Sequence, residues 1–228
     1  MNKTNVLWRA SFLQLRVYMW CVFGIVTASF VSNFIVYMST GYQEDNNQVS
    51  IGNMLTIFLI FVAIVLPTAF FKRIINLGAT RKQYYVGLIT IYTMWSAAFA
   101  LFNVLWLELE KGFIREYTNI FNLLEIFHWD QFGVIGMFLY QFGTYMLLAS
   151  LLNLLFSGLR HPVGWILWVL LIAAIPIGTS IPSLRVHVAD GFLALLFNDS
   201  LFAGLGLTLG LSVLFLFGGW LLTSRRTF

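Results

Sequence analysis

The chain has 228 residues, of which 60% are hydrophobic and 10% are charged, and its formal net charge is +4. Soluble domains carry about 25% charged residues because charge keeps a surface in contact with water. The composition therefore excludes a soluble domain and predicts one all-α membrane domain over residues 1–228. The basic residues lie at the ends of apolar segments, which predicts contact with membrane lipid and no nucleic-acid partner. The single cysteine, Cys21, excludes an internal disulfide and a thiolate metal cluster.

The N-terminal residues 4–16 are polar and basic, with Trp8, Phe12 and Leu15 on one helical face. Arg9 and Arg16 lie on the remaining faces. This pattern predicts a short interfacial helix along the inner headgroups. A frayed basic tail is the alternative that the residues leave open.

Six uncharged stretches are long enough to cross a bilayer, which takes about 20 mostly apolar residues. We expect transmembrane helices near residues 17–38, 51–71, 84–107, 132–159, 162–181 and 201–224. Pro176 and Pro182 predict that the fifth helix ends early. In the sixth, glycines such as Gly206 and Gly210 would permit close approach of another helix.

The distribution of basic residues predicts the orientation of these helices. With the N-terminus inside, ten of the 13 Lys and Arg residues fall in inner segments and three, Lys111, Arg115 and Arg185, fall outside. This is the bias of the positive-inside rule, and it places both termini in the cytoplasm. The ten inner residues are Lys3, Arg9, Arg16, Lys72, Arg73, Arg81, Lys82, Arg160, Arg225 and Arg226.

Two outer connections carry apolar patterns of their own. Residues 108–131 place Phe113, Tyr117, Ile120, Leu124 and Phe127 at helical spacing, which predicts one amphipathic helix on the outer surface. Residues 190–198 contain the run FLALLF, which is too short to cross and predicts a re-entrant or interfacial piece.

The six predicted helices contain no Asp, Glu, Lys, Arg or His. Coupling to an ion gradient usually needs such groups at mid-membrane, so this mechanism is disfavoured, although backbone carbonyls could bind sodium. Intramembrane aspartyl proteolysis would need aspartates within the helices, and there are none. Serine–histidine and metal-dependent catalysis would need histidines there, but His128, His161 and His187 lie in connections. The chain also has no GxxxxGK[ST] phosphate loop. We therefore expect no enzyme and no cofactor in this chain, and active transport would need ATP and Mg²⁺ bound by another subunit.

The inner connection at residues 72–83 lies within the sequence FKRIINLGATRKQYYVG, Phe71 to Gly87. Residues 71–77 fit a short amphipathic helix, and Gly78 permits a turn that a Cβ would resist. Thr80 and Gln83 match a capping box, which predicts a new helix from Arg81. Positive charge in a first helical turn opposes the helix dipole, so Arg81 and Lys82 would serve lipid phosphates, topology or an acidic protein surface. A plain basic loop explains the charges but not the order of helix, glycine and cap.

This segment resembles the coupling-helix loop of type-two ABC transporter permeases. In small members from Gram-positive bacteria the loop is similar to R-x-x-x-x-G-[AVST]-[ST]-R-x-x-[YF]-[YF]-x-G. The chain has Arg73, Gly78, Ala79, Thr80, Arg81, Tyr84, Tyr85 and Gly87 at these places. The overall layout also agrees, except that the long segment at 108–131 is not a general feature of that family.

The resemblance implies the transmembrane subunit of an ATP-driven exporter in the cytoplasmic membrane of a bacterium. Two such subunits, identical or not, would form the pathway, and two copies of an ABC ATPase subunit would supply the energy. The expected cargo is an amphipathic or hydrophobic peptide, lipid-like molecule or drug, because the helices offer no partner for a buried charge. The alternative is a non-transporting sensor or a resistance or immunity protein. The residues expected to contact the ATPase are Phe71, Arg73, Ile74, Asn76, Leu77, Gly78, Ala79, Thr80 and Arg81.

Overall fold

A computed structural model describes residues 15–16, 19–21, 23–28, 31–32, 35, 48–114 and 120–226. Within them the chain is helical apart from two short strands. The α-helices are α2 Ile51–Val65, α3 Phe71–Asn76, α4 Arg81–Leu109, α5 Leu123–Ile126, α6 Gly133–Ser157, α7 Pro162–Ser180, α8 Pro182–Leu196 and α9 Leu201–Ser224. Two π-helical turns cover Leu66–Phe70 and Glu110–Ile114, and two 3-10 turns cover Trp129–Phe132 and Gly158–Arg160. The strands β1 (Gln48–Val49) and β2 (Ile120–Phe121) pair in parallel.

Five helices of the described residues are long and apolar enough to cross a membrane, which indicates a multi-pass membrane protein. They run over Ile51–Asn76, Arg81–Phe113, Trp129–Ser157, Pro162–Ser180 and Leu201–Ser224. These bounds confirm that helices lie at five of the six predicted positions, with ends that agree to within a few residues. The first predicted helix, 17–38, is described only in part, with residues 19–21 and 23–28 helical. The predicted interfacial helix at 4–16 lies outside the described residues, except for Leu15 and Arg16.

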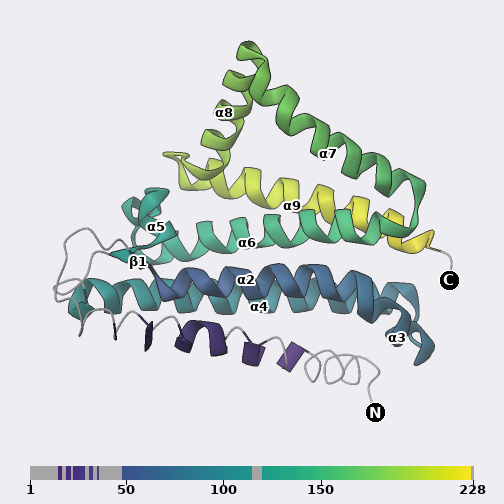
Figure 1. The fold of residues 1–228 in the computed structure, drawn as a ribbon, viewed down its shortest axis with the longest axis horizontal. Coiled ribbons are helices and arrows are strands. Elements are labelled where there is room, and N and C mark those ends of the chain that lie inside the picture. The colour runs from purple at the N-terminus through teal and green to yellow at the C-terminus, as the bar shows by residue number, and fades with distance from the viewer. Residues whose placement is uncertain are drawn as a thin grey trace.

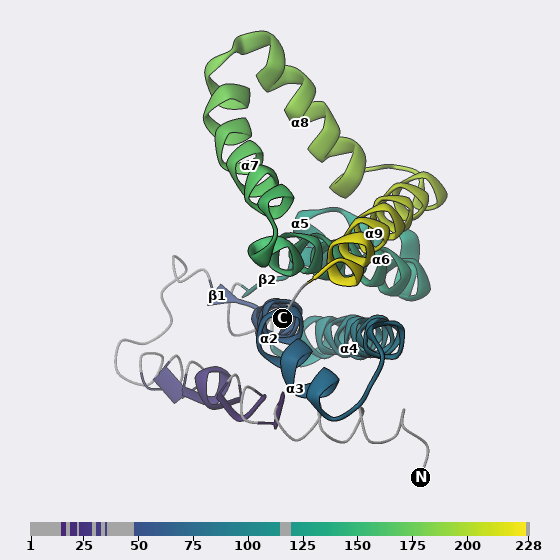
Figure 2. The same ribbon diagram turned by 90° about the vertical axis from the view of Figure 1, so that its right-hand side faces the viewer.

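Helices α2, α4, α6 and α9 lie side by side with their long axes nearly aligned (Figures 1 and 2). The core between them is aromatic and aliphatic, and its largest buried side chains include Tyr92, Tyr140 and Phe58. Small residues bring α6 and α9 together, since Gly204 lies against the Tyr140 ring and Gly143 against Thr208. Close backbone approach at glycine is the usual means of helix association in membranes.

Helices α7 and α8 form a hairpin that leaves the bundle and returns to α9 (Figure 1). Only 11% of the apolar stretch of α7 is buried inside the structure, whereas 50% of the apolar stretch of the helix that contains α6 is buried. Helix α7 passes through Pro176 and ends at Ser180, before Pro182, so the fifth helix ends where expected but Pro176 does not end it. The predicted short piece at 190–198 is wrong in extent, because all of the run FLALLF except its last residue belongs to α8, which begins at Pro182 and ends at Leu196. Its position in the membrane stays a prediction.

The single amphipathic helix predicted at 108–131 is wrong. The structure has instead the turn Glu110–Ile114, the strand β2, the short α5 and the turn Trp129–Phe132. The Asn122 side chain caps α5 by accepting from the Leu124 N–H, and His128 (φ 58°) and Gly133 (φ 68°) turn the chain sharply. The apolar residues consequently do not share a face. Leu124 is fully buried, Phe113 is 73% exposed, and Tyr117 lies outside the described residues.

Candidate functional site

The connection between α3 and α4 is a fixed turn. Helix α3 ends in a Schellman motif: Gly78 N–H donates to the Ile75 carbonyl (2.9 Å), and Ala79 N–H donates to the Ile74 carbonyl (3.4 Å). Gly78 has φ +85°, a left-handed conformation that side chains with a Cβ resist. The predicted turn at Gly78 is therefore confirmed. The turn supplies hydrogen-bond donors to carbonyl groups in the last turn of α3, which would otherwise have none within the helix.

Helix α4 begins with the predicted capping box. The Gln83 N–H donates to Thr80 Oγ1 (3.2 Å), and the Thr80 N–H donates to Gln83 Oε1 (3.0 Å). Both prediction and structure start the helix at Arg81. Two motifs of purely local sequence thus determine the path of residues 76–83.

Between α2 and α3, Pro67 interrupts the regular backbone hydrogen bonding of the helix. Proline has no N–H to donate, and the turn Leu66–Phe70 is π-helical, so nearby carbonyls need other partners. Tyr84 donates its hydroxyl to the Leu66 carbonyl (2.7 Å), and Tyr92 donates to the Ala63 carbonyl (3.3 Å). In a regular helix the N–H of residue 67 would donate to the Ala63 carbonyl, so the Tyr92 hydroxyl supplies the donor that Pro67 lacks. The Tyr84 hydroxyl adds a second contact from α4 to the π-helical turn. Tyr84 also packs edge-on against Phe71.

The C-terminal end of the described chain completes this site. Arg226 Nη1 donates to the Pro67 carbonyl (2.7 Å), and its guanidinium lies 4.5 Å from the centre of the Phe71 ring. Arg81 donates to the Ser224 carbonyl. Tyr85 joins the same region to the bundle, since its hydroxyl donates to the Leu216 carbonyl and accepts from Asn153 Nδ2 (3.1 Å).

The nine residues expected to face an ATPase differ in how far they are exposed. Phe71 and Ile74 are buried and hold α3 against the bundle, and Ala79 and Arg81 are half-buried. The exposed ones are Arg73, Asn76, Leu77, Gly78 and Thr80. Leu77 is a large apolar side chain at the tip of the loop, and it is 70% exposed. Lys72 and Lys82, which precede and follow Leu77 in the chain, are exposed as well.

The sequence prediction missed Arg226 and Tyr92 as parts of this site. One signal was present for Tyr92: a proline within a predicted helix leaves a carbonyl that needs a donor. Arg226 is 159 residues from Pro67 in the chain, and nothing local points to their contact.

Among the described residues, no group of three or more His, Cys, Asp or Glu side chains is close enough to hold a metal ion. The chemistry that the loop presents is an apolar tip beside positive charge. Comparisons with protein-family models, curated proteins and solved structures find no match for the chain.

Proposed function

We propose that the chain is the transmembrane subunit of an ATP-driven ABC exporter. The observation that supports this most directly is the exposure of Leu77 on a loop that is capped at both ends. A large apolar side chain held in a fixed position on a basic loop can serve as an anchor that fills a pocket of a partner protein. The resemblance of residues 73–87 to the coupling loop of such permeases indicates which partner: an ABC ATPase subunit, present in two copies.

The contacts around the loop support a mechanism in this proposal. A push on α3 reaches α2 through the continuous helix Ile51–Asn76, and it reaches α4 through the short connection at Gly78. Arg81 and Arg226 carry the same displacement to the end of α9. ATP-driven closure of the partner would thereby rock the helices together between two arrangements.

A second permease copy, the same chain or a related one, would complete the pathway in this proposal. The hairpin of α7 and α8 leaves an apolar surface outside the bundle, with side chains such as Trp165, Ile172 and Phe192 more than half exposed. The cargo is an amphipathic or hydrophobic molecule such as a peptide, lipid or drug. The location is the cytoplasmic membrane of a bacterium.

The test is purification of the tagged full chain from its native membrane, with identification of co-purifying ATPases and measurement of ATP hydrolysis. The wild type should bring down an ABC ATPase and show activity, whereas the chain alone should show none. Leu77→Asp should lose both the ATPase and the activity. Phe113→Asp is the matched control because Phe113 is 73% exposed at the opposite end of α4. Retention of the ATPase by Leu77→Asp, or the lack of any ABC ATPase with the wild type, would contradict the proposal.

A further inference from the structure

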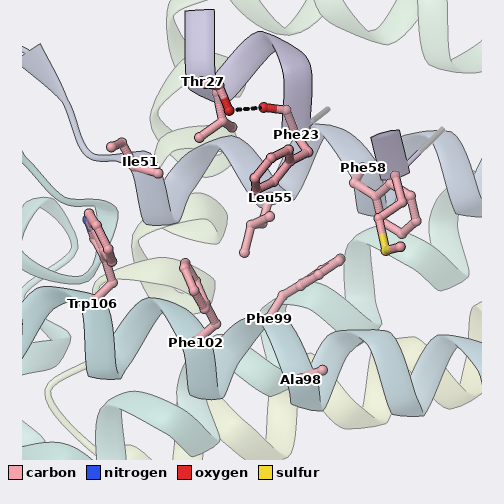
Figure 3. A pocket seen from close by; sticks show the side chains of 11 residues that line it. Phe23, Thr27, Ile51, Leu55, Phe58, Ala98, Phe99, Phe102 and Trp106 are labelled. Atoms are coloured by element: carbon pink, nitrogen blue, oxygen red, sulfur yellow. Dashed lines mark hydrogen bonds between the residues drawn. The ribbon is translucent and has the colours of Figure 1, made fainter. Parts of the chain in front are cut away.

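A cavity of about 630 Å³ lies between α2, α4 and the N-terminal helical residues 19–21 and 23–28 (Figure 3). Pockets of small-molecule size cover about 300–1,000 Å³. Phe58 and Phe99 are buried and form its floor, whereas Phe23 (61% exposed) and Phe102 (41% exposed) lie at its open side. The cavity is thus open to the outer surface of the helix bundle on the side of Phe23 and Phe102.

The described walls of this cavity offer a ligand no free hydrogen-bond donor. Its one hydroxyl, Thr27 Oγ1, donates to the Phe23 carbonyl within the same helix (2.8 Å). Its one indole N–H, that of Trp106, donates to Glu110 Oε1 (2.6 Å). All other lining side chains are hydrocarbon or the thioether of Met19. A polar occupant would therefore find only the acceptor lone pairs of Thr27 Oγ1, and such a site favours a hydrocarbon.

The position of the cavity along α4 indicates which hydrocarbon. Its α4 lining extends from Ala98 to Trp106, which is about 12 Å at the rise of an α-helix. Trp106 is at the end where charged residues begin with Glu108, and a tryptophan there is typical of the headgroup level. The floor at Phe58 and Phe99 lies farther into the apolar part. The cavity therefore runs from the headgroup level into the bilayer, which is the direction of an acyl chain.

We propose that this cavity binds one acyl chain of a phospholipid from the surrounding bilayer. The chain enters between the N-terminal helical residues and α4, with its headgroup at the level of Trp106. The exposed Phe23 and Phe102 contact the bilayer interior on the open side, so the occupant need not leave the membrane to bind. This inference does not depend on an ATPase partner.

The experiment uses the purified full chain in nanodiscs of phosphatidylcholine and phosphatidylglycerol. A trace of phosphatidylcholine carries a diazirine in the middle of one acyl chain, and adducts are mapped by mass spectrometry after illumination. We expect adducts on cavity residues, Phe58, Phe99 and Phe102, well above those on outward-facing residues such as Leu105 and Val169. Equal labelling of both groups would overturn the proposal.

Two variants that fill the cavity sharpen the test. Ala98→Trp fills it from α4, and Leu55→Trp fills it from α2, so one remains usable if the other fails to fold. Either should lose the cavity adducts. Leu101→Trp is the matched control, because Leu101 is 52% exposed on α4 and does not line the cavity. Unchanged cavity adducts in a folded filled variant, or an equal loss in the control, would contradict specific binding of an acyl chain.

Discussion

The guanidinium of Arg81, in the first turn of α4, donates a hydrogen bond to the carbonyl oxygen of Ser224, the last residue of α9. A cation at this position lies at the negative end of the α9 dipole and satisfies a carbonyl that has no partner within its helix. Arg81 is unfavourable for the dipole of α4 but favourable for that of α9. Its positive charge therefore has a role within the chain, in addition to any role toward lipid or a partner.

The first prediction follows from this contact. Arg81→Glu should lower the free energy of unfolding by about 1–2 kcal/mol, because it removes a charged hydrogen bond and places an anion at the C-terminal end of α9. Lys82→Glu makes the same charge change at an exposed neighbour and should have little effect on stability. Thermal unfolding of the purified variants measures both. Equal midpoints would show that the Arg81 contact contributes nothing.

Gly78 allows a test of backbone conformation without steric overlap. A Cβ added there would meet nothing within 4 Å, so any cost comes from its φ of +85°. We expect Gly78→Val to destabilise the loop by about 1–2 kcal/mol, and Gly78→Asn to cost less because asparagine tolerates this conformation. Hydrogen exchange of the amides in residues 71–84 should rise in the valine variant and much less in the asparagine variant. The same exchange in both variants would argue against a left-handed Gly78.

Two glycines of α9 form a matched pair for helix packing. A Cβ at Gly204 would overlap the Tyr140 ring, whereas a Cβ at Gly206 would meet nothing within 4 Å. Gly204→Val should lower the free energy of unfolding by about 1–3 kcal/mol through overpacking between α6 and α9, and Gly206→Val should be neutral. Thermal unfolding in detergent distinguishes the two. If Gly206→Val reduces self-association with stability unchanged, a second copy packs at that glycine, as the sequence left open.

A buried polar network joins the start of α2, the end of α4 and the segment after β2, at the end of the bundle opposite Leu77. Ser50 Oγ and Trp106 Nε1 both donate to Glu110 Oε1 at 2.6 Å, and Asn122 Nδ2 donates to Ser50 Oγ at 3.2 Å. In a double-mutant cycle, Ser50→Ala and Glu110→Ala should show a coupling energy of about 0.5–3 kcal/mol because either change alone already removes the hydrogen bond between the two side chains. Glu108→Ala, on the exposed side of α4, is the control and should show no coupling with Ser50→Ala. Additive free energies for Ser50 and Glu110 would refute the network.

The orientation in the membrane can be tested with single cysteines in a Cys21→Ser background. Asn76→Cys and Gln83→Cys place thiols on exposed positions at the end of α3 and the start of α4, the expected cytoplasmic end, and Asp130→Cys places one at the expected outer end. An impermeant thiol reagent should label only Asp130→Cys in intact cells, and all three after permeabilisation. Labelling at position 76 or 83 in intact cells would reverse the topology.

Local chemistry in the sequence determined the helices and the turn between α3 and α4. Long uncharged runs gave the five described membrane-length helices, because length and apolarity alone decide whether a segment can cross. The turn at Gly78 and the cap by Thr80 and Gln83 depend on residues within a few positions of one another, so they could be predicted with their hydrogen bonds. The spacing of apolar residues at 108–131 predicted one helix, and this prediction was wrong because tertiary contacts favour a turn, a strand and a short helix there.

Only the tertiary structure decided which residues meet across the bundle. Asn53 of α2, Asn103 of α4 and Asn122 of the segment after β2 lie together and form hydrogen bonds with one another. These hydrogen bonds hold the segment at 108–131 in a conformation other than the single helix that the apolar spacing predicted. The contacts of Arg226 with Pro67, of Arg81 with Ser224, and the cavity beside Phe99 likewise join distant segments. A membrane helix is apolar on faces toward lipid and toward protein alike, so hydrophobic periodicity does not reveal its packing face. Polar side chains and glycines carry that information, and their partners become known only when the helices are placed side by side.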